Sequence, residues 1–189
     1  LNEQHGSDEL KITLMPLFIE ALSMALKQFP LFNSRANNDF TELTYLANHN
    51  IGMAVDGASG LLVPNIKAVE QRSIIDIATQ VMSLTAAARS GKINPADLKG
   101  GSITISNIGA IGGTVATPII NKPEVAIVAL GKIQRLPRFD DQGNVVARNI
   151  MTISWSGDHR VIDGGTIARF NNCWKGYLEQ PATMLVAMV

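Results

Sequence analysis

The sequence predicts a single α/β domain of the α+β kind, a two-layer sandwich in which a mixed β-sheet carries helices on one side. The chain has 189 residues, which suits one domain, and 46% of them are hydrophobic, enough for a sizeable core. Segments with helical and with strand periodicity follow one another without the strict alternation of a doubly wound fold. No internal repeat or low-complexity tract divides the sequence.

Three segments have the apolar spacing of helices with one buried face. From 11 to 29, apolar residues recur at three- and four-residue steps, and Thr13 can cap this helix. A second helix is expected from 73 to 90. A third carries Trp174 on its apolar stripe and ends before Pro181.

Runs rich in β-branched residues, separated by glycine and proline, predict the strands. Residues 51–55 and 61–66 read as two strands joined by a short loop, and Pro64 makes the second an edge strand or a bulge. We expect the central strands of the sheet to be formed by three further runs, which are 101–106, 125–131 and 151–156.

The composition of the chain bears on which partners and which cellular environment it suits. Sixteen basic and sixteen acidic side chains cancel, so no overall field would attract nucleic acid or an anionic membrane. No apolar run is long enough to span a membrane. The single cysteine, Cys173, cannot form an intrachain disulfide, which suits a reducing compartment. The apolar end at 184–189 is expected to dock against its own fold or against a neighbouring chain.

The stretch SGDHRVIDGG, residues 156–165, is the first candidate for chemistry. A histidine between a strand and a helix is usually structural, but charged neighbours favour a catalytic role for His159. Gly164 and Gly165 would permit the backbone angles of a turn that aims the imidazole into a cleft. Metal binding is poorly supported, because Asp163 alone has ligand spacing to His159.

Ser106 ends a predicted strand and precedes Asn107 and a glycine-rich loop. In one interpretation both side chains only satisfy local backbone groups at a turn. In the other, the Ser106 hydroxyl donates to a developing oxyanion. The surrounding TISNI lacks the GxSxG pattern of a serine hydrolase, and GAIGG lacks the lysine of a phosphate-binding loop.

Four motifs give the sequence a recognisable relationship. TISNIGAIGG, PIINKPEVAIVALG, SWSGDHRVIDGG and RFNNCWKGYLEQPATML together resemble the catalytic core domain of the dihydrolipoyl acyltransferases of 2-oxo acid dehydrogenase complexes. The resemblance spans essentially the whole chain and implies the fold of chloramphenicol acetyltransferase. SNIGAIGGT with PEVAIVALG is most similar to the branched-chain type. The alternatives are a pyruvate-type (acetyl) transferase, a non-catalytic structural core protein, and a free-standing acetyltransferase.

The resemblance implies roles for individual residues. His159 would be a general base toward the thiol of coenzyme A or dihydrolipoamide, Ser106 would stabilise the oxyanion, and Asp163 would support the geometry of the site. No metal is implied. Positions that contact coenzyme A in the family correspond to Thr13, Asp56, Ser106, Asn107, Gly131 and Ile133. Thr13 stands where relatives have serine, so its match is weaker.

The resemblance also implies an organisation. Residues 1–189 would be an acyltransferase catalytic domain that lacks its first N-terminal segment, with the lipoyl and peripheral subunit-binding domains absent from this chain. Coenzyme A would be a substrate, and the lipoyl group would be carried on a separate domain. A homotrimer, in which the histidine of one subunit faces the serine of the next, would build a cubic core of 24 subunits. Decarboxylase and dihydrolipoyl dehydrogenase components would bind through the missing domains, in a bacterial cytoplasm or a mitochondrial matrix.

Overall fold

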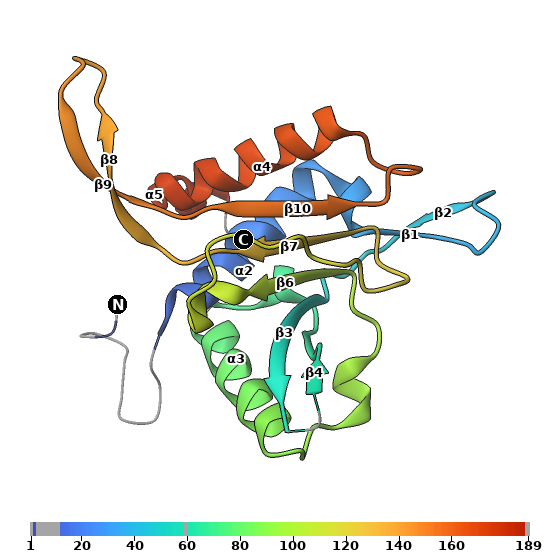
Figure 1. Ribbon diagram of the computed structural model, residues 1–189. Coiled ribbons are helices and arrows are strands. Elements are labelled where there is room, and N and C mark those ends of the chain that lie inside the picture. Colours follow the sequence, from blue (N-terminus) through green and yellow to red (C-terminus); the bar gives the residue numbers. More distant parts are fainter. Residues whose placement is uncertain (1, 3–11, 59, 188–189) are drawn as a thin grey trace.

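A computed structural model describes residues 2, 12–58 and 60–187 (Figure 1). A six-stranded mixed sheet, two separate hairpins and four helices of the α type make up the described part. The strands are β1 (Ser34–Ala36), β2 (Leu43–Tyr45), β3 (Ile51–Gly57), β4 (Gly60–Leu62), β5 (Asn65–Ile66), β6 (Ile103–Asn107), β7 (Ala126–Leu130), β8 (Gln134–Phe139), β9 (Val145–Ile150) and β10 (Ile153–Gly157). The α-helices are α2 (Leu14–Gln28), α3 (Ile74–Arg89), α4 (Gly164–Glu179) and α5 (Ala182–Ala187). Short 3-10 helices are η1 (Pro30–Asn33), η2 (Val69–Gln71), η3 (Pro95–Leu98) and η4 (Ile108–Ile111).

The main sheet has the strand order β10-β7-β6-β3-β4, and β5 also pairs with β3. Strands β3, β6 and β7 are parallel, whereas β10, β4 and β5 pair antiparallel with their neighbours. The mixed sheet predicted from the sequence is therefore confirmed. The expectation that 151–156 forms a central strand was wrong, because β10 pairs only with β7 and forms an edge in the described chain. The expected strand 61–66 is interrupted around Pro64, as a bulge would be.

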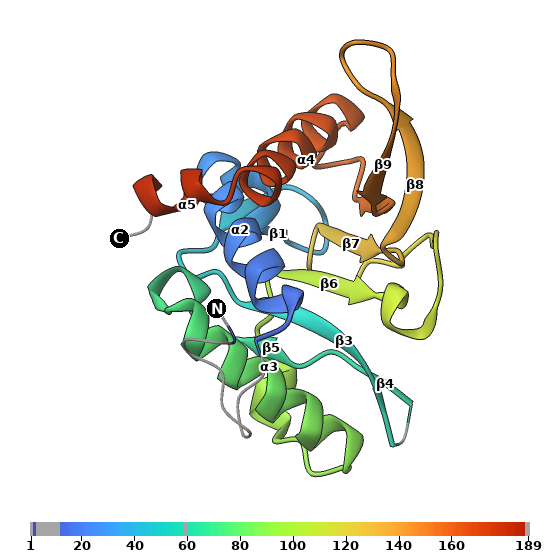
Figure 2. The ribbon, with the colours of Figure 1, turned by 90° about the vertical axis from the view of Figure 1, so that its left-hand side faces the viewer.

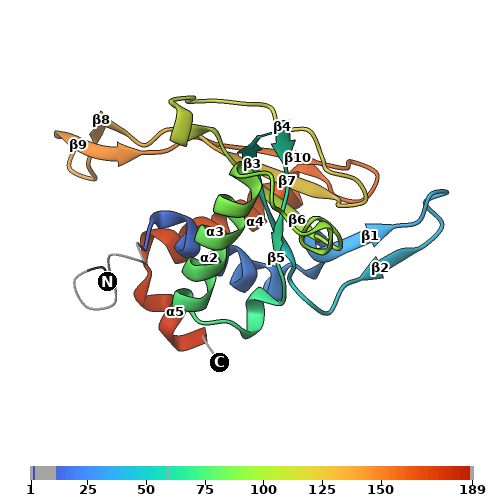
Figure 3. The ribbon, with the colours of Figure 1, turned by 90° about the horizontal axis from the view of Figure 1, so that it is seen from below.

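The helices cover one face of the sheet. Figures 2 and 3 show α2, α3 and α4 on the same side, with the strands forming the other layer. Alternate side chains of the central strands, such as Met53, Ile105 and Val128, lie in register and are buried in the core beneath the helices. Since successive strand residues point to opposite faces, the residues between them face the helix-free side.

An aromatic cluster joins α4 to the sheet and to the chain around η1. The rings of Phe32 and Phe170 stack at 3.8 Å, and Trp155 meets Phe170 edge-on at 5.2 Å. Trp174 is fully buried, and its indole N–H donates to the carbonyl of Phe18 on α2 at 3.1 Å. This cluster fixes α4, and with it the turn that precedes α4.

The N-termini of α2 and α3 agree only partly with what the sequence predicts. Ser73 begins α3 with a full capping box, in which it pairs reciprocally with Asp76. Thr13 occupies the N-cap position of α2, but its side chain makes no capping hydrogen bond. Its hydroxyl is therefore not committed to the helix.

Two hairpins project from opposite ends of the molecule (Figure 1). β1 pairs with β2 at one end, and β8 pairs with β9 at the other. Sequence analysis did not predict either one. No residue of β8 or β9 is buried, and QRLPRF has no apolar face that would identify it as a strand packed on a core.

The apolar C-terminal segment is only partly buried. Met184 of α5 is buried, whereas Leu185 and Val186 are 74% and 90% exposed. The remainder of 184–189, like His5, falls outside what can be described of side chains. Within the described residues, no helix has the length and apolar character needed to cross a membrane.

Candidate active site

His159 lies in the turn between β10 and α4, at the edge of the sheet. Its side chain is exposed. The preceding residue ties the turn to the neighbouring strand, because the backbone N–H of Asp158 donates to the carbonyl of Val125 at 2.8 Å. The same residue organises the turn, since its carbonyl accepts from the N–H groups of Val161 and Ile162, both at 2.9 Å.

Arg160 is held beside His159 by two kinds of contact. Its Nε and Nη2 atoms donate to the two carboxylate oxygens of Asp158 at 2.9 and 2.7 Å. Its guanidinium lies 3.4 Å from the ring centroid of Phe40, which comes from the β1–β2 hairpin. These residues line a cavity of about 250 Å³ that also contacts Lys122 and Glu124.

Asp163 is the N-cap of α4. Its Oδ1 accepts from the backbone N–H of Thr166 and its Oδ2 from the Thr166 hydroxyl, both at 2.8 Å. These two hydrogen bonds hold the pKa of the Asp163 carboxyl below its ordinary value. Gly164 and Gly165 form the first turn of α4 without positive φ angles, so the predicted special backbone angles were wrong.

Ser106 lies near the carboxyl end of β6, where it pairs with Ala54 of β3 and Ala129 of β7. Because Ile105 beside it is buried under the helices, strand alternation turns Ser106 to the helix-free face. It is half-buried there. The next residue, Asn107, points to the opposite face and its Oδ1 accepts from the N–H of Ala110, which caps η4.

The glycine-rich loop after Asn107 packs closely on the end of β7. A Cβ atom at Gly109 would lie 2.6 Å from the carbonyl oxygen of Gly131, and one at Gly131 would lie 2.1 Å from that of Thr114. The N–H of Lys132 also donates to the carbonyl of Gly113 at 2.7 Å. Glycine is therefore required where the two backbones meet.

A cavity of about 370 Å³ opens between this loop and the start of α2. It brings together four of the residues expected to contact coenzyme A, which are Thr13, Asn107, Gly131 and Ile133. Asp56, in the β3–β4 hairpin, does not line it, and neither does Ser106. Sequence reasoning missed Lys132, Met15, Phe18 and Met151, which complete its walls. Only the approach of α2 to the ends of β6 and β7 brings them together.

Ser106 and His159 lie far apart within one chain. Ser106 is in register with Ala129 and so with Ser154 of β10, from which the chain runs on to Gly157 before the turn. At the usual spacings, Gly157 is therefore displaced from Ser106 by about 10 Å along the strands and about 10 Å across them. The two side chains therefore cannot act on the same atom within a single copy.

A buried polar cluster lies beside the histidine end of the sheet. Glu124, 5% exposed, accepts from the Thr104 hydroxyl at 2.6 Å and from the amide of Asn121 at 3.1 Å. Burial raises the pKa of Glu124 to about 7, against the opposing effect of these hydrogen bonds. Sequence analysis missed this residue, although a glutamate directly before a run of apolar residues was a usable signal. Among the described residues, no three His, Cys, Asp or Glu side chains gather as a metal site.

The geometry can be compared with known proteins. Residues 1–186 match the family described as 2-oxoacid dehydrogenases acyltransferase (catalytic domain). The lipoamide acyltransferase component of the branched-chain alpha-keto acid dehydrogenase complex of Mus musculus is 51% identical over 94% of this chain and 37% of its own length. The dihydrolipoyllysine-residue acetyltransferase component of the pyruvate dehydrogenase complex of Bacillus subtilis is 40% identical, over 97% of this chain and 42% of its length.

Solved structures give the same relationship. The cubic core of the pyruvate dehydrogenase multienzyme complex superposes with a TM-score of 0.89 at 38% identity, over 93% of this chain and 72% of that one. The dihydrolipoamide acetyltransferase of Azotobacter vinelandii, studied for the catalytic role of a serine, a histidine and an asparagine, has a TM-score of 0.90 at 37% identity over 97% and 74%. Chloramphenicol acetyltransferase, with a TM-score of 0.59 at 16% identity over 94% and 80%, shares the fold.

These matches confirm the predicted fold and the resemblance that the motifs carried. The chain spans less than half the length of the curated relatives above. Those relatives are components of multienzyme complexes, and they come from a mitochondrion and from a bacterium. Since the family match extends over nearly every residue, the chain belongs to the 2-oxoacid dehydrogenases acyltransferase (catalytic domain) family.

Proposed function

We propose that this chain is an acyltransferase domain that moves an acyl group between dihydrolipoamide and coenzyme A. The observation that carries the proposal is the separation of Ser106 from His159. Each copy has a serine half-site at the carboxyl ends of β6 and β7 and a histidine half-site at the opposite end of the sheet. In a ring of copies, the histidine of one chain would meet the serine of the next, which supports a homotrimer.

His159 would act as the general base. The imidazole takes the proton from the attacking thiol while the sulfur of that thiol forms a bond to the thioester carbonyl carbon. In water, complete proton transfer from a thiol to an imidazole is uphill by about 2 pKa units, or about 2.7 kcal/mol, so transfer accompanies attack. When the tetrahedral intermediate collapses, the departing sulfur takes the proton back from the imidazolium.

Ser106 would stabilise that intermediate. Its hydroxyl donates a hydrogen bond to the oxygen that becomes negative when the carbonyl is attacked. Its place on a central strand, paired on both sides, gives the rigidity that such a donor needs. Removing an oxyanion donor typically raises the barrier by about 2.7–4 kcal/mol.

Asp163 would position the turn and would not handle protons. Both of its carboxylate oxygens are engaged by Thr166, and these bonds favour the ionised form. In the Azotobacter enzyme, a histidine and an asparagine studied for catalysis are four positions apart, as are His159 and Asp163. An asparagine oxygen can accept the same hydrogen bond, so proton transfer is not needed from this position.

The cavity at the start of α2 would bind coenzyme A. Thr13 and Asn107 offer polar groups, and the exposed ammonium of Lys132 suits an anionic ligand. Asp56 lies on the same sheet face as Ser106 two residues beyond Ala54, so its contact with coenzyme A would be made outside this cavity. The lipoyl group would arrive on a separate domain.

For the acyl group, we propose a branched-chain acyl. Support comes from the 51% identity to the branched-chain component, against 40% to the pyruvate-complex component. Acetyl transfer is the second candidate, because the structural relatives include the core of the pyruvate dehydrogenase complex. We further propose that trimers build a cubic 24-subunit core that serves decarboxylase and dihydrolipoyl dehydrogenase components, in a bacterial cytoplasm or a mitochondrial matrix.

The substrate assay offers isobutyryl-, acetyl- and succinyl-coenzyme A in turn, with dihydrolipoamide as acceptor. We expect the highest kcat/KM with isobutyryl-coenzyme A. A preference for the acetyl thioester would move the assignment to the pyruvate type. Absence of transfer with all three would indicate a structural core protein, and activity only with chloramphenicol would indicate a free-standing acetyltransferase.

A mixing experiment tests the shared site directly. Ser106→Ala and His159→Ala chains are each expected to be inactive, but co-assembled trimers contain both intact halves at about one quarter of their sites. Activity should recover to about that fraction of the wild-type rate. Native mass spectrometry checks that mixed trimers form. No recovery in verified mixed trimers would contradict a site shared between chains.

A further inference from the structure

We propose that Asp158 and Arg160, which flank His159, form with Phe40 of the β1–β2 hairpin a clamp that positions His159. This inference rests on the proposed function, in which His159 is the base. The clamp links the tip of the β1–β2 hairpin to the turn after β10, and these segments are far apart in the sequence. It assigns the arginine beside the histidine a positioning role.

Arg160 is held by two sets of contacts, although its side chain remains 58% exposed. Two of its three nitrogens donate to the carboxylate of Asp158, at 2.9 and 2.7 Å, in a bidentate pair. Its planar face lies over the Phe40 ring at 3.4 Å from the centroid. A guanidinium held along one edge and on one face has a fixed orientation relative to the turn, and this supports a positioning role.

Asp158 passes this restraint to the backbone that carries His159. Its N–H is bonded to the carbonyl of Val125 beside β7, and its carbonyl accepts from two later residues of the turn. Its carboxylate also accepts from the backbone N–H of Arg160 at 3.1 Å. His159 therefore lies between Asp158, whose backbone is bonded to Val125, and Arg160, which pairs with Asp158 and stacks on Phe40.

Phe40 is presented to Arg160 by a strained backbone. Its φ angle of 58° lies in the left-handed region, where a bulky non-glycine residue is uncommon. The loop around it supports this conformation. The carbonyl of Asn37 accepts from the Phe40 N–H at 3.1 Å, and the Asn37 side-chain amide donates to the Thr41 hydroxyl. Asn37 and Glu42 also exchange hydrogen bonds. Such strain persists where the surroundings over-determine it, often at functional sites.

The clamp matters because of where His159 lies. The turn that holds His159 follows the edge strand β10, and His159 is exposed in the described chain. A displacement of about 1 Å at a catalytic group can cost about a hundredfold in rate. The Phe40 ring adds a contact to Arg160 from a segment far away in the sequence.

The test uses Arg160→Lys, which keeps the charge but removes the planar fork, and Phe40→Ala, with Phe40→Tyr as the conservative variant. We expect Arg160→Lys and Phe40→Ala to lower kcat by about tenfold to a hundredfold. KM for coenzyme A should not change, since its cavity lies at the other end of the sheet. Phe40→Tyr should keep kcat near that of the wild type. The double variant Arg160→Lys/Phe40→Ala should lower kcat no more than the more damaging of its two single substitutions.

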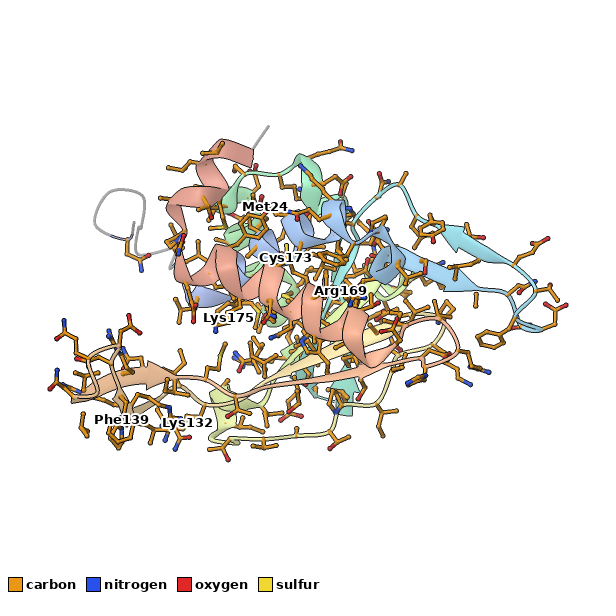
Figure 4. All side chains as sticks on the ribbon, turned by 90° about the horizontal axis from the view of Figure 1, so that it is seen from above. Met24, Lys132, Phe139, Arg169, Cys173 and Lys175 are labelled. Atoms are coloured by element: carbon orange, nitrogen blue, oxygen red, sulfur yellow. The ribbon has the colours of Figure 1, made fainter. Side chains whose placement is uncertain are left out.

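Hydrogen exchange gives a readout that does not depend on activity. Mass spectrometry should show faster exchange of the amides at 158–162 in the two disruptive variants, with unchanged exchange in α3 of the same samples. Arg138→Lys and Phe139→Ala serve as matched controls on the β8–β9 hairpin, where Figure 4 shows Phe139 well away from α4. Both controls should leave the turn unchanged.

Two results would overturn the clamp. Unchanged exchange and unchanged kcat would show that the turn is rigid without it, and a lower kcat with unchanged exchange would show that Arg160 acts on the substrate instead. Failure of the proposed function is seen separately, as activity retained by His159→Ala. The exchange measurement still decides the clamp in that case.

Discussion

The buried carboxyl of Glu124 should make the stability of the fold fall as the pH rises. The perturbation is Glu124→Gln, which has nearly the same shape but cannot ionise. In the folded chain the Glu124 carboxyl has a pKa of about 7, raised by burial from an ordinary 4.5. The folded state therefore holds a proton that the unfolded state has already released between pH 4.5 and 7.

The direction and the size of the change in folding stability follow from this difference in pKa between the folded and unfolded states. A raised folded-state pKa contributes stability that is fully present below about pH 4.5 and is lost as the pH rises through about 7. At about 1.4 kcal/mol per pKa unit, the loss reaches about 3 kcal/mol for Glu124 alone. The glutamine variant should match the wild type near pH 4.5 and be more stable than it by up to about that amount at pH 8.

Urea unfolding at fixed protein concentration, at half-unit steps between pH 4.5 and 8, measures this effect. The concentration must be fixed because assembly adds to apparent stability. Burial also raises the pKa of Glu20 to about 7, so Glu20→Gln should remove a further part of the pH dependence. A free-energy difference between wild type and Glu124→Gln that is constant across this range would refute the reasoning.

Substitutions at three more positions follow from particular contacts. Gly131→Ala would place a methyl group 2.1 Å from the carbonyl oxygen of Thr114, so we expect a loss of at least about 1–3 kcal/mol and a higher KM for coenzyme A, measured by urea unfolding and initial rates. Trp174→Phe leaves the Phe18 carbonyl without its donor and opens a gap in the aromatic cluster, which should cost about 2–3 kcal/mol in the same unfolding assay. Asp163→Ala should cost about 1 kcal/mol by removing the cap of α4, whereas Asp163→Asn should keep both stability and activity; an inactive but stable asparagine variant would show that the charge itself is used.

Much of the architecture could be predicted because it depends on local pattern. The period of the apolar residues located α2, α3 and α4, and β-branched runs located β3, β6 and β7. The hairpins β1–β2 and β8–β9 escaped prediction because they extend away from the core and lack a buried face. Thr13 illustrates the same limit, since a residue suited to capping sits at the cap position without making the bond.

The sequence by itself determined which residue types stand at the two half-sites, since the motifs around Ser106 and His159 can be read directly. Only the tertiary structure decided where they lie. β10 runs antiparallel to β7, so the turn after it returns to the end of the sheet opposite Ser106. The contact between Phe40 and Arg160 could not be predicted from the sequence either. It joins segments that are far apart along the chain, so it depends on how whole elements pack and not on a local pattern.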